Sequence, residues 1–283
     1  MFRPAFHALR AVPRPPVRAI STSAVRTAEA RPGPALSQTN RAEHTLRRFW
    51  KHAHVKEDPE GPGFLVTLDH RPLKSPAGTK LVLPKDRRLL AALIAHEWEN
   101  QDQVLKQHAL PLTSLASRAV DGFGAPGSPT REGVIDALME YLETDTICFP
   151  GETPSALVRL QKEHWDPLVA WLKDTYGVTL GQTTGFGLPE HSEGARDKLR
   201  VVLEGMDAWE LAAFERAVYA TKSFVAALAF VKGRITADEA AHAAHVEVRA
   251  QIEQWGEVED THDVDYQDIR RSLGTVAMLL ARV

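Results

Sequence analysis

Cysteine is almost missing from this chain, which has one, Cys148, among 283 residues. A single thiol excludes an intramolecular disulfide and a zinc site built from several cysteines. Its neighbours Ile147 and Phe149 are apolar and no base lies close by in the sequence, so we expect a buried structural thiol. The low cysteine content fits a reducing compartment.

Long hydrophobic runs are missing as well. The longest, residues 224–231, lies between Lys222 and Lys232 and is far shorter than the ~20 residues that a membrane-spanning helix needs. The chain is 43% hydrophobic and 25% charged, which is typical of soluble globular proteins. We therefore expect no stable membrane insertion.

Acidic residues are missing from the N-terminus, where none occurs before Glu29. The same stretch has several hydroxyl side chains and five arginines: Arg3, Arg10, Arg14, Arg18 and Arg26. This composition is typical of a mitochondrial presequence, which we place at residues 1–30, with a polar linker at 31–44. A merely disordered basic tail is the alternative.

Processing of such a presequence changes the charge of the protein. Arg18, Ile20 and Ser23 resemble a two-step cleavage pattern that leaves a mature start near Ala28. Loss of residues 1–27 removes five arginines and no acid, so the formal net charge changes from −3 to −8. The acidic body has no basic stripe, and we expect no nucleic-acid partner. The predicted location is the mitochondrial matrix.

Recognisable catalytic motifs are also missing: the chain has no Gly-rich phosphate loop and no GxSxG elbow. One weak cluster, which lacks the HExxH spacing, consists of His242, His245, His262, Asp263 and Asp265. We interpret its histidines as surface or packing residues. The sequence therefore predicts neither an enzyme, nor a metal site, nor a cofactor; a matrix metal-dependent hydrolase using the 242–265 cluster is the alternative.

What is present is a short β-containing region followed by helices. Alternating or β-rich stretches separated by Gly- and Pro-rich turns predict a small antiparallel meander, at residues 49–55, 64–68, 71–74 and 80–83. Pro72 places its strand at an edge or a bulge. Helical periodicity follows at residues 86–101, 113–122, from 129, 154–177, 189–204, 207–232 and 265–282.

The fold class predicted from these elements is α+β. We expect a β-containing N-terminal domain at residues 45–125 and a larger, all-helical C-terminal domain at 126–283. Pro167 predicts two helices or one sharply kinked helix within 154–177. The 207–232 helix is apolar nearly all round, and we expect it at the buried centre of the helical part.

The stretch from Thr236 onwards predicts one long helix that ends at Gly256. Thr236 and Glu239 can form a capping box. One face carries a stripe that we expect to pack on a neighbouring helix: Ala237, Ala240, Ala241, Ala244, Val248, Ile252 and Trp255. The opposite face is charged, with Val246 as its lone apolar residue. An ordinary solvated face is one interpretation of it.

Eight motifs in a fixed order match one known family. They are RFWK from Arg48, LDHRPLK from Leu68, EWENQ from Glu97, PLT from Pro111, YLETDT from Tyr141, WDP from Trp165, KS from Lys222 and QIEQWG from Gln251. The chain resembles the Atp12 family, mitochondrial assembly factor 2 of the F1 sector of the ATP synthase, over residues 45 to 280. Where the family usually has Gly in the LDGRPLK turn this chain has His70, which predicts a strained turn or another turn type.

The resemblance implies a chaperone and not an enzyme. Members bind the free F1 α subunit and promote assembly of the α/β hexamer, without a metal or nucleotide of their own. We expect this chain to have that function and to be a monomer when free.

Within the QIEQWG motif, Glu253 lies opposite the apolar stripe and has no packing duty, so we expect it to contact the α subunit. The other expected client-binding residues are Glu247, Arg249, Gln251 and Glu257. A simple ion pair between Glu253 and Arg249 is the alternative. Expected structural residues are Trp98, Trp255 and Gly256.

Overall fold

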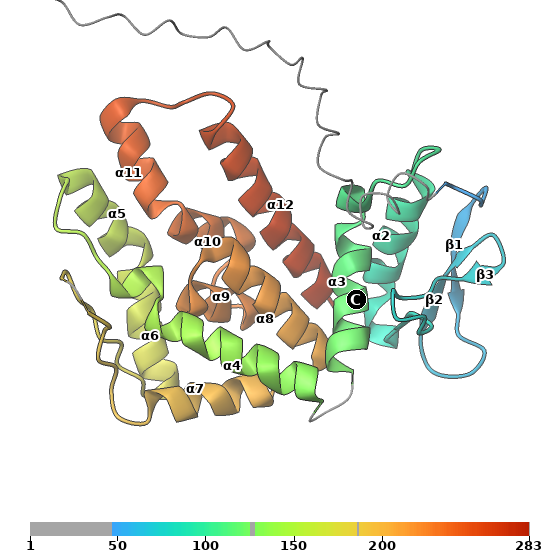
Figure 1. The fold of residues 1–283 in the computed structure, drawn as a ribbon, viewed down its shortest axis with the longest axis horizontal. Coiled ribbons are helices and arrows are strands. Elements are labelled where there is room, and N and C mark those ends of the chain that lie inside the picture. The colour runs from blue at the N-terminus through green and yellow to red at the C-terminus, as the bar shows by residue number, and fades with distance from the viewer. Residues whose placement is uncertain (1–46, 125–127, 186, 283) are drawn as a thin grey trace, which may run out of the picture. The chain divides into compact units, whose positions relative to one another are not determined.

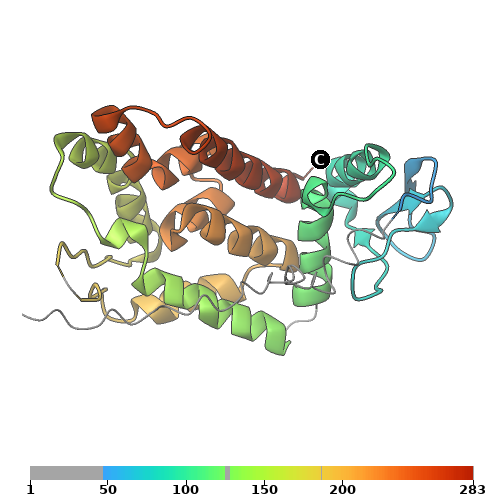
Figure 2. The same cartoon turned by 45° about the horizontal axis from the view of Figure 1, so that its top comes forward.

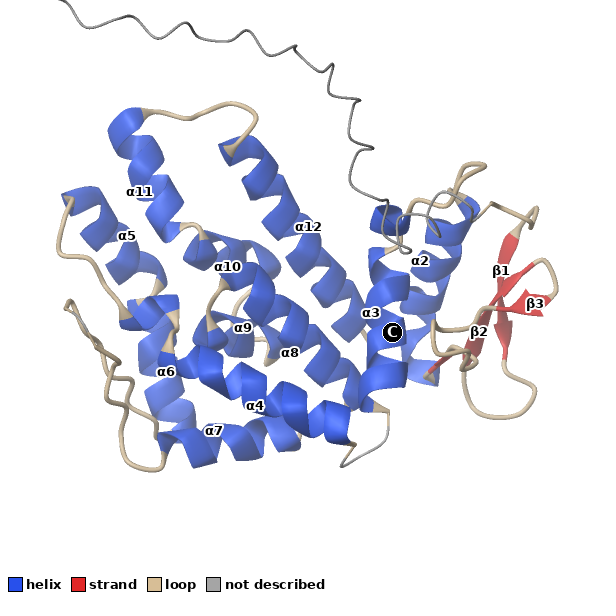
Figure 3. Cartoon of the chain, in the orientation of Figure 1, coloured by secondary structure: helices blue, strands red, loops and turns tan. Residues whose placement is uncertain are grey.

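The computed structural model describes residues 47–124, 128–185 and 187–282. These residues confirm the α+β class: a small antiparallel sheet comes first and a succession of helices follows (Figure 1; Figure 3). The expected presequence and linker, residues 1–44, lie outside the described residues. No helix among the described residues is both long and apolar enough to cross a membrane.

The sheet is built around its second strand, β2 (Phe64–Leu68), which is the most buried. β1 (Ala53–Glu57) and β3 (Arg71–Pro72) flank β2, and β4 (Val82–Leu83) also pairs with it. All three pairings are antiparallel. The expected meander is confirmed in part: the segments 71–74 and 80–83 meet in an antiparallel bridge between Lys74 and Lys80, but β4 itself pairs with β2 and not with β3. Pro72 does lie on an edge strand, as its missing N–H requires.

The turn between β2 and β3 is organised by Asp69 rather than by His70. Asp69 has the positive φ, 55°, and His70 does not. The Asp69 carboxylate accepts hydrogen bonds from the backbone N–H groups of Lys51 and His52 at 3.0 Å each. Of the two outcomes expected for this turn, the structure has the second, another turn type: the left-handed residue is Asp69, and aspartate tolerates that conformation comparatively well.

The helices occupy most of the predicted ranges. They are α2 (Arg88–Glu99), α3 (Pro111–Phe123), α4 (Pro129–Glu143), α5 (Ser155–His164), α6 (Asp166–Tyr176), α7 (Ala195–Glu204), α8 (Ala208–Thr221), α9 (Phe224–Val231), α10 (Ala237–Ala244), α11 (Val246–Trp255) and α12 (His262–Leu280). Short 3-10 turns lie at Lys85–Arg87, Gln107–Ala109 and Thr146–Cys148. Of the two arrangements open for 154–177, the structure has two helices, separated at Trp165.

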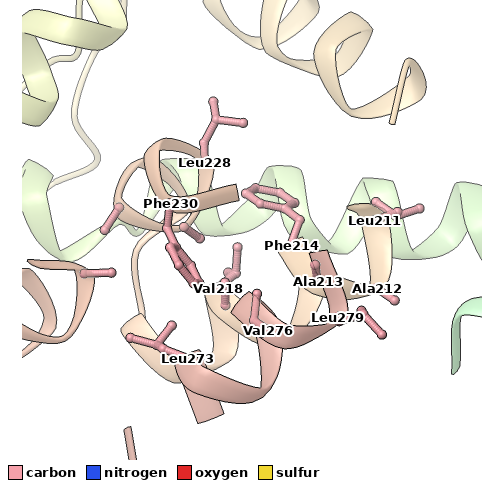
Figure 4. Packing of buried hydrophobic residues seen from close by; sticks show 14 of the residues in the cluster. Leu211, Ala212, Ala213, Phe214, Val218, Leu228, Phe230, Leu273, Val276 and Leu279 are labelled. Carbon is pink, nitrogen blue, oxygen red and sulfur yellow. The ribbon is translucent and has the colours of Figure 1, made fainter. Parts of the chain in front are cut away.

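The predicted 207–232 helix is two helices. Lys222 adopts a left-handed conformation, φ 55°, and ends α8, and the Ser223 hydroxyl accepts a hydrogen bond from the N–H of Ala226 to start α9. Both helices are nevertheless the buried centre that the apolar sequence predicts. Figure 4 shows Phe214 and Val218 of α8 together with Leu273 of α12 in this core.

The division into domains at residues 125 and 126 stays a prediction. The described residues, 47–124, 128–185 and 187–282, belong to one compact unit. α3, on the N-terminal side of that boundary, packs extensively against α8 and also touches α12. α2 in turn covers β1 and β2. The sheet, α2 and α3 are therefore continuous with the helical core.

Candidate interaction surface

The region expected to be one helix from residue 236 to 255 is broken at His245. α10 begins with the predicted capping box: Glu239 Oε2 accepts from the Thr236 N–H at 2.7 Å, and Thr236 Oγ1 accepts from the Glu239 N–H at 3.2 Å. At His245 the backbone leaves the helical conformation, with φ −95° and ψ 10°. The side chains of α11 therefore do not continue the helical faces of α10 in register.

The break redistributes burial along the predicted stripe. Ala240 and Ala241 are buried as expected, but Val246, expected to face water, is fully buried. Trp255, expected to hold the helix down, is 73% exposed, so its structural role is corrected. The reason is the break, because side chains after His245 no longer continue the face that the alanines define. α11 ends at Trp255, and Gly256 supplies the positive φ of 87° at that end.

The structure brings the five expected client-binding residues onto or just beyond α11. Glu247, Gln251, Glu253 and Glu257 are exposed, and Arg249 is half-buried. Glu253 is not paired with Arg249. Its two carboxylate oxygens each lie 2.7 Å from Nη2 of Arg159, on α5, while Arg249 Nη1 lies 3.3 Å from Nε2 of His164. The alternative of a local i, i+4 pair is thus replaced by a contact between helices.

Arg159 is the residue of this surface that the sequence did not suggest. It precedes Glu253 by 94 positions and lies in a helix with no motif around it. α5 and α11 pack side by side (Figures 1 and 2). Glu253 holds the pKa of the Arg159 guanidinium above its ordinary value, chiefly by the hydrogen bonds. No local signal in the sequence could have found this pair.

The histidines of the weak cluster do not gather around one point. His245 is buried, and its Nε2 lies 3.1 Å from Oδ2 of Asp265. His262 Nδ1 accepts a hydrogen bond from the N–H of Val258, and Asp263 accepts one from Val264. Within residues 47–124, 128–185 and 187–282, no three His, Cys, Asp or Glu side chains are arranged to hold a metal ion.

Burial controls the titration of His245 and of the single thiol. Desolvation lowers the pKa of His245, and the Asp265 carboxylate partly opposes this effect. Cys148 is buried, and desolvation raises its pKa to about 12, so the thiol stays protonated. A protonated, buried thiol is not a nucleophile.

Several of the other motifs are joined to one another by hydrogen bonds and aromatic contacts within the structure. The Glu97 carboxylate accepts from the N–H groups of Leu112 and Thr113 at 2.7 and 2.9 Å, and Trp98 Nε1 donates to Thr113 Oγ1 at 3.0 Å. These bonds join EWENQ to PLT. Trp98 itself is half-buried, with its ring 5.1 Å from that of Trp50 in RFWK.

A second set of hydrogen bonds joins YLETDT to KS. Asp145 is fully buried, and its Oδ2 accepts from Ser223 Oγ at 3.0 Å and from the N–H of Val225 at 2.9 Å. Its Oδ1 accepts from the N–H of Ile147. Desolvation raises the pKa of Asp145 to about 6 although these donors lower it. In the WDP motif, the buried Trp165 donates its indole N–H to the carbonyl of Ala243 at 2.8 Å.

QIEQWG differs from these joined motifs. Of its six residues only Ile252 is even half-buried, and the others are exposed. Its side chains offer charge, amide groups and an open indole ring, which are groups for recognition at a surface. A helical scaffold that presents charged, amide and indole groups on an exposed helix end fits the class of protein-binding proteins.

Comparisons with known proteins agree with this class. The family model described as "ATP12 chaperone protein" matches residues 47–173. The chain is 36% identical over 242 residues to "Protein atp12, mitochondrial" of Schizosaccharomyces pombe, covering 83% of this chain and 82% of the relative. It is 28% identical over 279 residues to "Protein ATP12, mitochondrial" of Saccharomyces cerevisiae, covering 86% of each.

A solved structure is similar as well. The crystal structure of Atp12 from Paracoccus denitrificans superimposes with a TM-score of 0.71 at 29% identity, over 83% of this chain and 98% of that one. The chain belongs to the ATP12 chaperone family. Both fungal relatives are named mitochondrial, and this chain is a mitochondrial protein, in agreement with the basic N-terminal composition.

Proposed function

We propose that this chain binds the unassembled α subunit of the F1 ATP synthase in the mitochondrial matrix and promotes assembly of the α/β hexamer. Family membership makes it an assembly chaperone of the ATP synthase. The finer statement, that the α subunit is the client, rests on the motif resemblance. An unassembled α subunit exposes the apolar surface that β later covers, and such a surface aggregates unless another protein covers it.

The observation that supports a client contact on α11 is the exposure of the QIEQWG motif. The other motifs discussed above hold the fold together, whereas this one turns Gln251, Glu253 and Trp255 to solvent. We place the contact on Glu253 with Glu247, Arg249, Gln251 and Glu257 around it. α11 itself rests on α5 and α10 through the buried Val246 and Ala250, while the exposed side chains of QIEQWG are outside the hydrophobic core.

Co-expression tests the proposal. The affinity-tagged chain is expressed with the α subunit, and in parallel with the β subunit as the matched control. We expect the α subunit, and not the β subunit, to co-purify, with the free chain sedimenting as a monomer. Binding that survives exhaustive dialysis against a chelator and without added nucleotide fits a function that needs no cofactor. Equal capture of both subunits, or of neither, contradicts the proposal.

The alternative, a metal-dependent hydrolase, has one geometric observation behind it, the pairing of His245 with Asp265. Of the other three members of the cluster, His262 and Asp263 accept hydrogen bonds from local backbone N–H groups, and His242 Nε2 lies 3.7 Å from Oδ2 of Asp238. Elemental analysis of the purified mature protein separates the two functions. Stoichiometric zinc or manganese favours the hydrolase.

A further inference from the structure

Exposed apolar side chains gather at one end of the helical part. Eleven large apolar residues are well exposed among the described residues, and four of them fall within positions 255–266: Trp255, Val258, Val264 and Tyr266. We call residues 255–266 the α11–α12 tip. It comprises the end of α11, the connection and the first turns of α12, and it lies away from the sheet (Figures 1 and 2).

The tip is anchored to the protein from beneath. Tyr266 stacks on the ring of His245, with centroids 6.0 Å apart and planes 12° apart. The guanidinium of Arg270 lies 3.4 Å from the centre of the Tyr266 ring. His245 in turn contacts Asp265. These contacts hold the start of α12 against the junction of α10 and α11, so Trp255 and Val258 project from a supported base.

The charge around Trp255 and Val258 is predominantly negative. Residues 247–268 contain eight acids and one arginine, Arg249, and the next basic residues, Arg270 and Arg271, lie further along α12, beside Tyr266 and Asp268. All eight acids are exposed. Five of them form no ion pair with another described residue: Glu247, Glu257, Glu259, Asp260 and Asp263. Asp263 lies in the first turn of α12, where its negative charge interacts favourably with the helix dipole. Glu257, Glu259 and Asp260 lie in the connection before α12 and have no such role.

An exposed tryptophan beside unpaired acids selects one kind of partner. Tryptophan is among the residues that contribute most to binding energy when it is covered in an interface. Unpaired carboxylates around it attract Lys and Arg, and they disfavour an acidic or purely apolar partner, because covering them without a partner costs free energy. Charge complementarity therefore fixes the chemistry of the occupant.

We propose that the α11–α12 tip is the seat for a basic amphipathic segment of the client polypeptide. Apolar side chains of that segment cover Trp255 and Val258, and its Lys or Arg side chains pair with Glu257, Glu259 and Asp260. The inference rests on the proposed function for the identity of the client, but not for the chemistry of the segment. It places the client contact beyond Glu253, on the tip as well as on α11.

A peptide titration tests the chemistry by itself. The probe is a fluorescently labelled amphipathic helical peptide of Leu and Lys, and the control peptide has Glu in place of Lys. The full chain is titrated against each, and we expect binding of the Lys peptide only, weakening as salt rises because the attraction is electrostatic. Equal binding of both peptides, or of neither, overturns the inference.

Variants connect the binding to the tip. Trp255→Ser with Val258→Ser is expected to weaken binding of the Lys peptide about tenfold or more. Glu257→Gln with Glu259→Gln is expected to weaken it less and to flatten the salt dependence. The matched control is Val201→Ser on α7, a site that is 66% exposed and distant in sequence. Unchanged melting temperatures verify the fold, and wild-type affinity in the Trp255 variant overturns the inference.

The same variants are then used with the co-expressed α subunit. If the wild-type chain captures α and the tip variants do so equally well, the tip is not the client seat, while the proposed function stands. If the wild-type chain does not capture α but the Lys peptide binds at the tip, the proposed function fails and the tip remains a receptor for a basic segment. Loss of both peptide and α binding in the tip variants supports the inference.

Discussion

Arg159 and Glu253 join α5 to α11 across 94 positions of the chain, with one guanidinium nitrogen 2.7 Å from both carboxylate oxygens. Both side chains are about half exposed. Ion pairs of this kind contribute little to stability, because water and salt screen them. The pair therefore sets the orientation of Glu253 at the surface more than it holds the two helices together.

Glu253→Lys is expected to leave the melting temperature nearly unchanged and to weaken capture of the α subunit at least about tenfold. The charge-swapped pair, Arg159→Glu with Glu253→Arg, separates two causes. If Glu253 acts only through its ion pair, the swap restores capture. If Glu253 contacts the client, the swap is as defective as Glu253→Lys. Wild-type capture by a folded Glu253→Lys variant would falsify the assignment of this face.

Trp98→Arg is expected to lower the free energy of unfolding by about 2–4 kcal/mol, since it removes large apolar contacts and brings a charge among apolar groups. Trp98 packs on Trp50 and donates to Thr113, which joins the sheet region to the start of α3. Urea unfolding measures the loss. Trp98→Phe, which keeps the ring contact and loses the indole donor, should lose less. A Trp98→Arg protein that melts within a few degrees of wild type contradicts this prediction.

Asp145→Asn is expected to lower the free energy of unfolding by about 2–3 kcal/mol. Both carboxylate oxygens accept hydrogen bonds, from Ile147 on one side and from Ser223 and Val225 on the other. An amide NH2 group must face one of these donors and leaves it unsatisfied. Ser223→Ala, which removes only one donor and one cap of α9, is the milder control. Equal stability of wild type and Asp145→Asn would show that the buried carboxylate is dispensable.

His245 is expected to make the protein less stable as the pH decreases below about 6.5, whereas Asp145, whose pKa is raised in the folded state, acts in the opposite direction. The pKa of His245 is lowered in the folded state, so the unfolded chain binds the proton more readily and gains stability as the pH falls. Asp265, Tyr266, Arg270 and His242 surround the ring. His245→Gln should flatten the dependence measured by urea unfolding at several pH values. His164, whose pKa is lowered in the same direction, and Asp145 contribute equally to both proteins, and an unchanged slope contradicts the role of His245.

The N-terminus of the protein taken from mitochondria is expected near Ala28, after removal of the five arginines of residues 1–27. Mass spectrometry of the N-terminal peptide measures this directly. As a control, Arg18→Ala should alter or slow cleavage, since Arg18 is the first residue of the predicted processing pattern. Isolation of a mature protein that begins at Met1 removes the support for matrix import.

Several features of this protein were determined by the sequence because they depend on neighbours within a few residues. Ser128 and Pro129 start α4, with the Ser128 hydroxyl accepting from the N–H of Arg131, as their order predicts. The capping box at Thr236, the strand at residues 64–68 and the buried character of α8 and α9 follow in the same way. Each is fixed by a local hydrogen bond or by apolar periodicity.

The tertiary structure decided the features that depend on residues far apart in the sequence, namely where the helix from Thr236 breaks and which side chains the surface presents. The helix from Thr236 breaks at His245. Close to the break, the indole N–H of Trp165, in the WDP motif, donates a hydrogen bond to the carbonyl of Ala243, and the His245 ring is buried against α12. The break then turns Trp255 to solvent, and α5 supplies Arg159 to Glu253. Helical periodicity does not predict these contacts, because the energy of burying a side chain depends on which elements pack around it and not on its spacing along the chain.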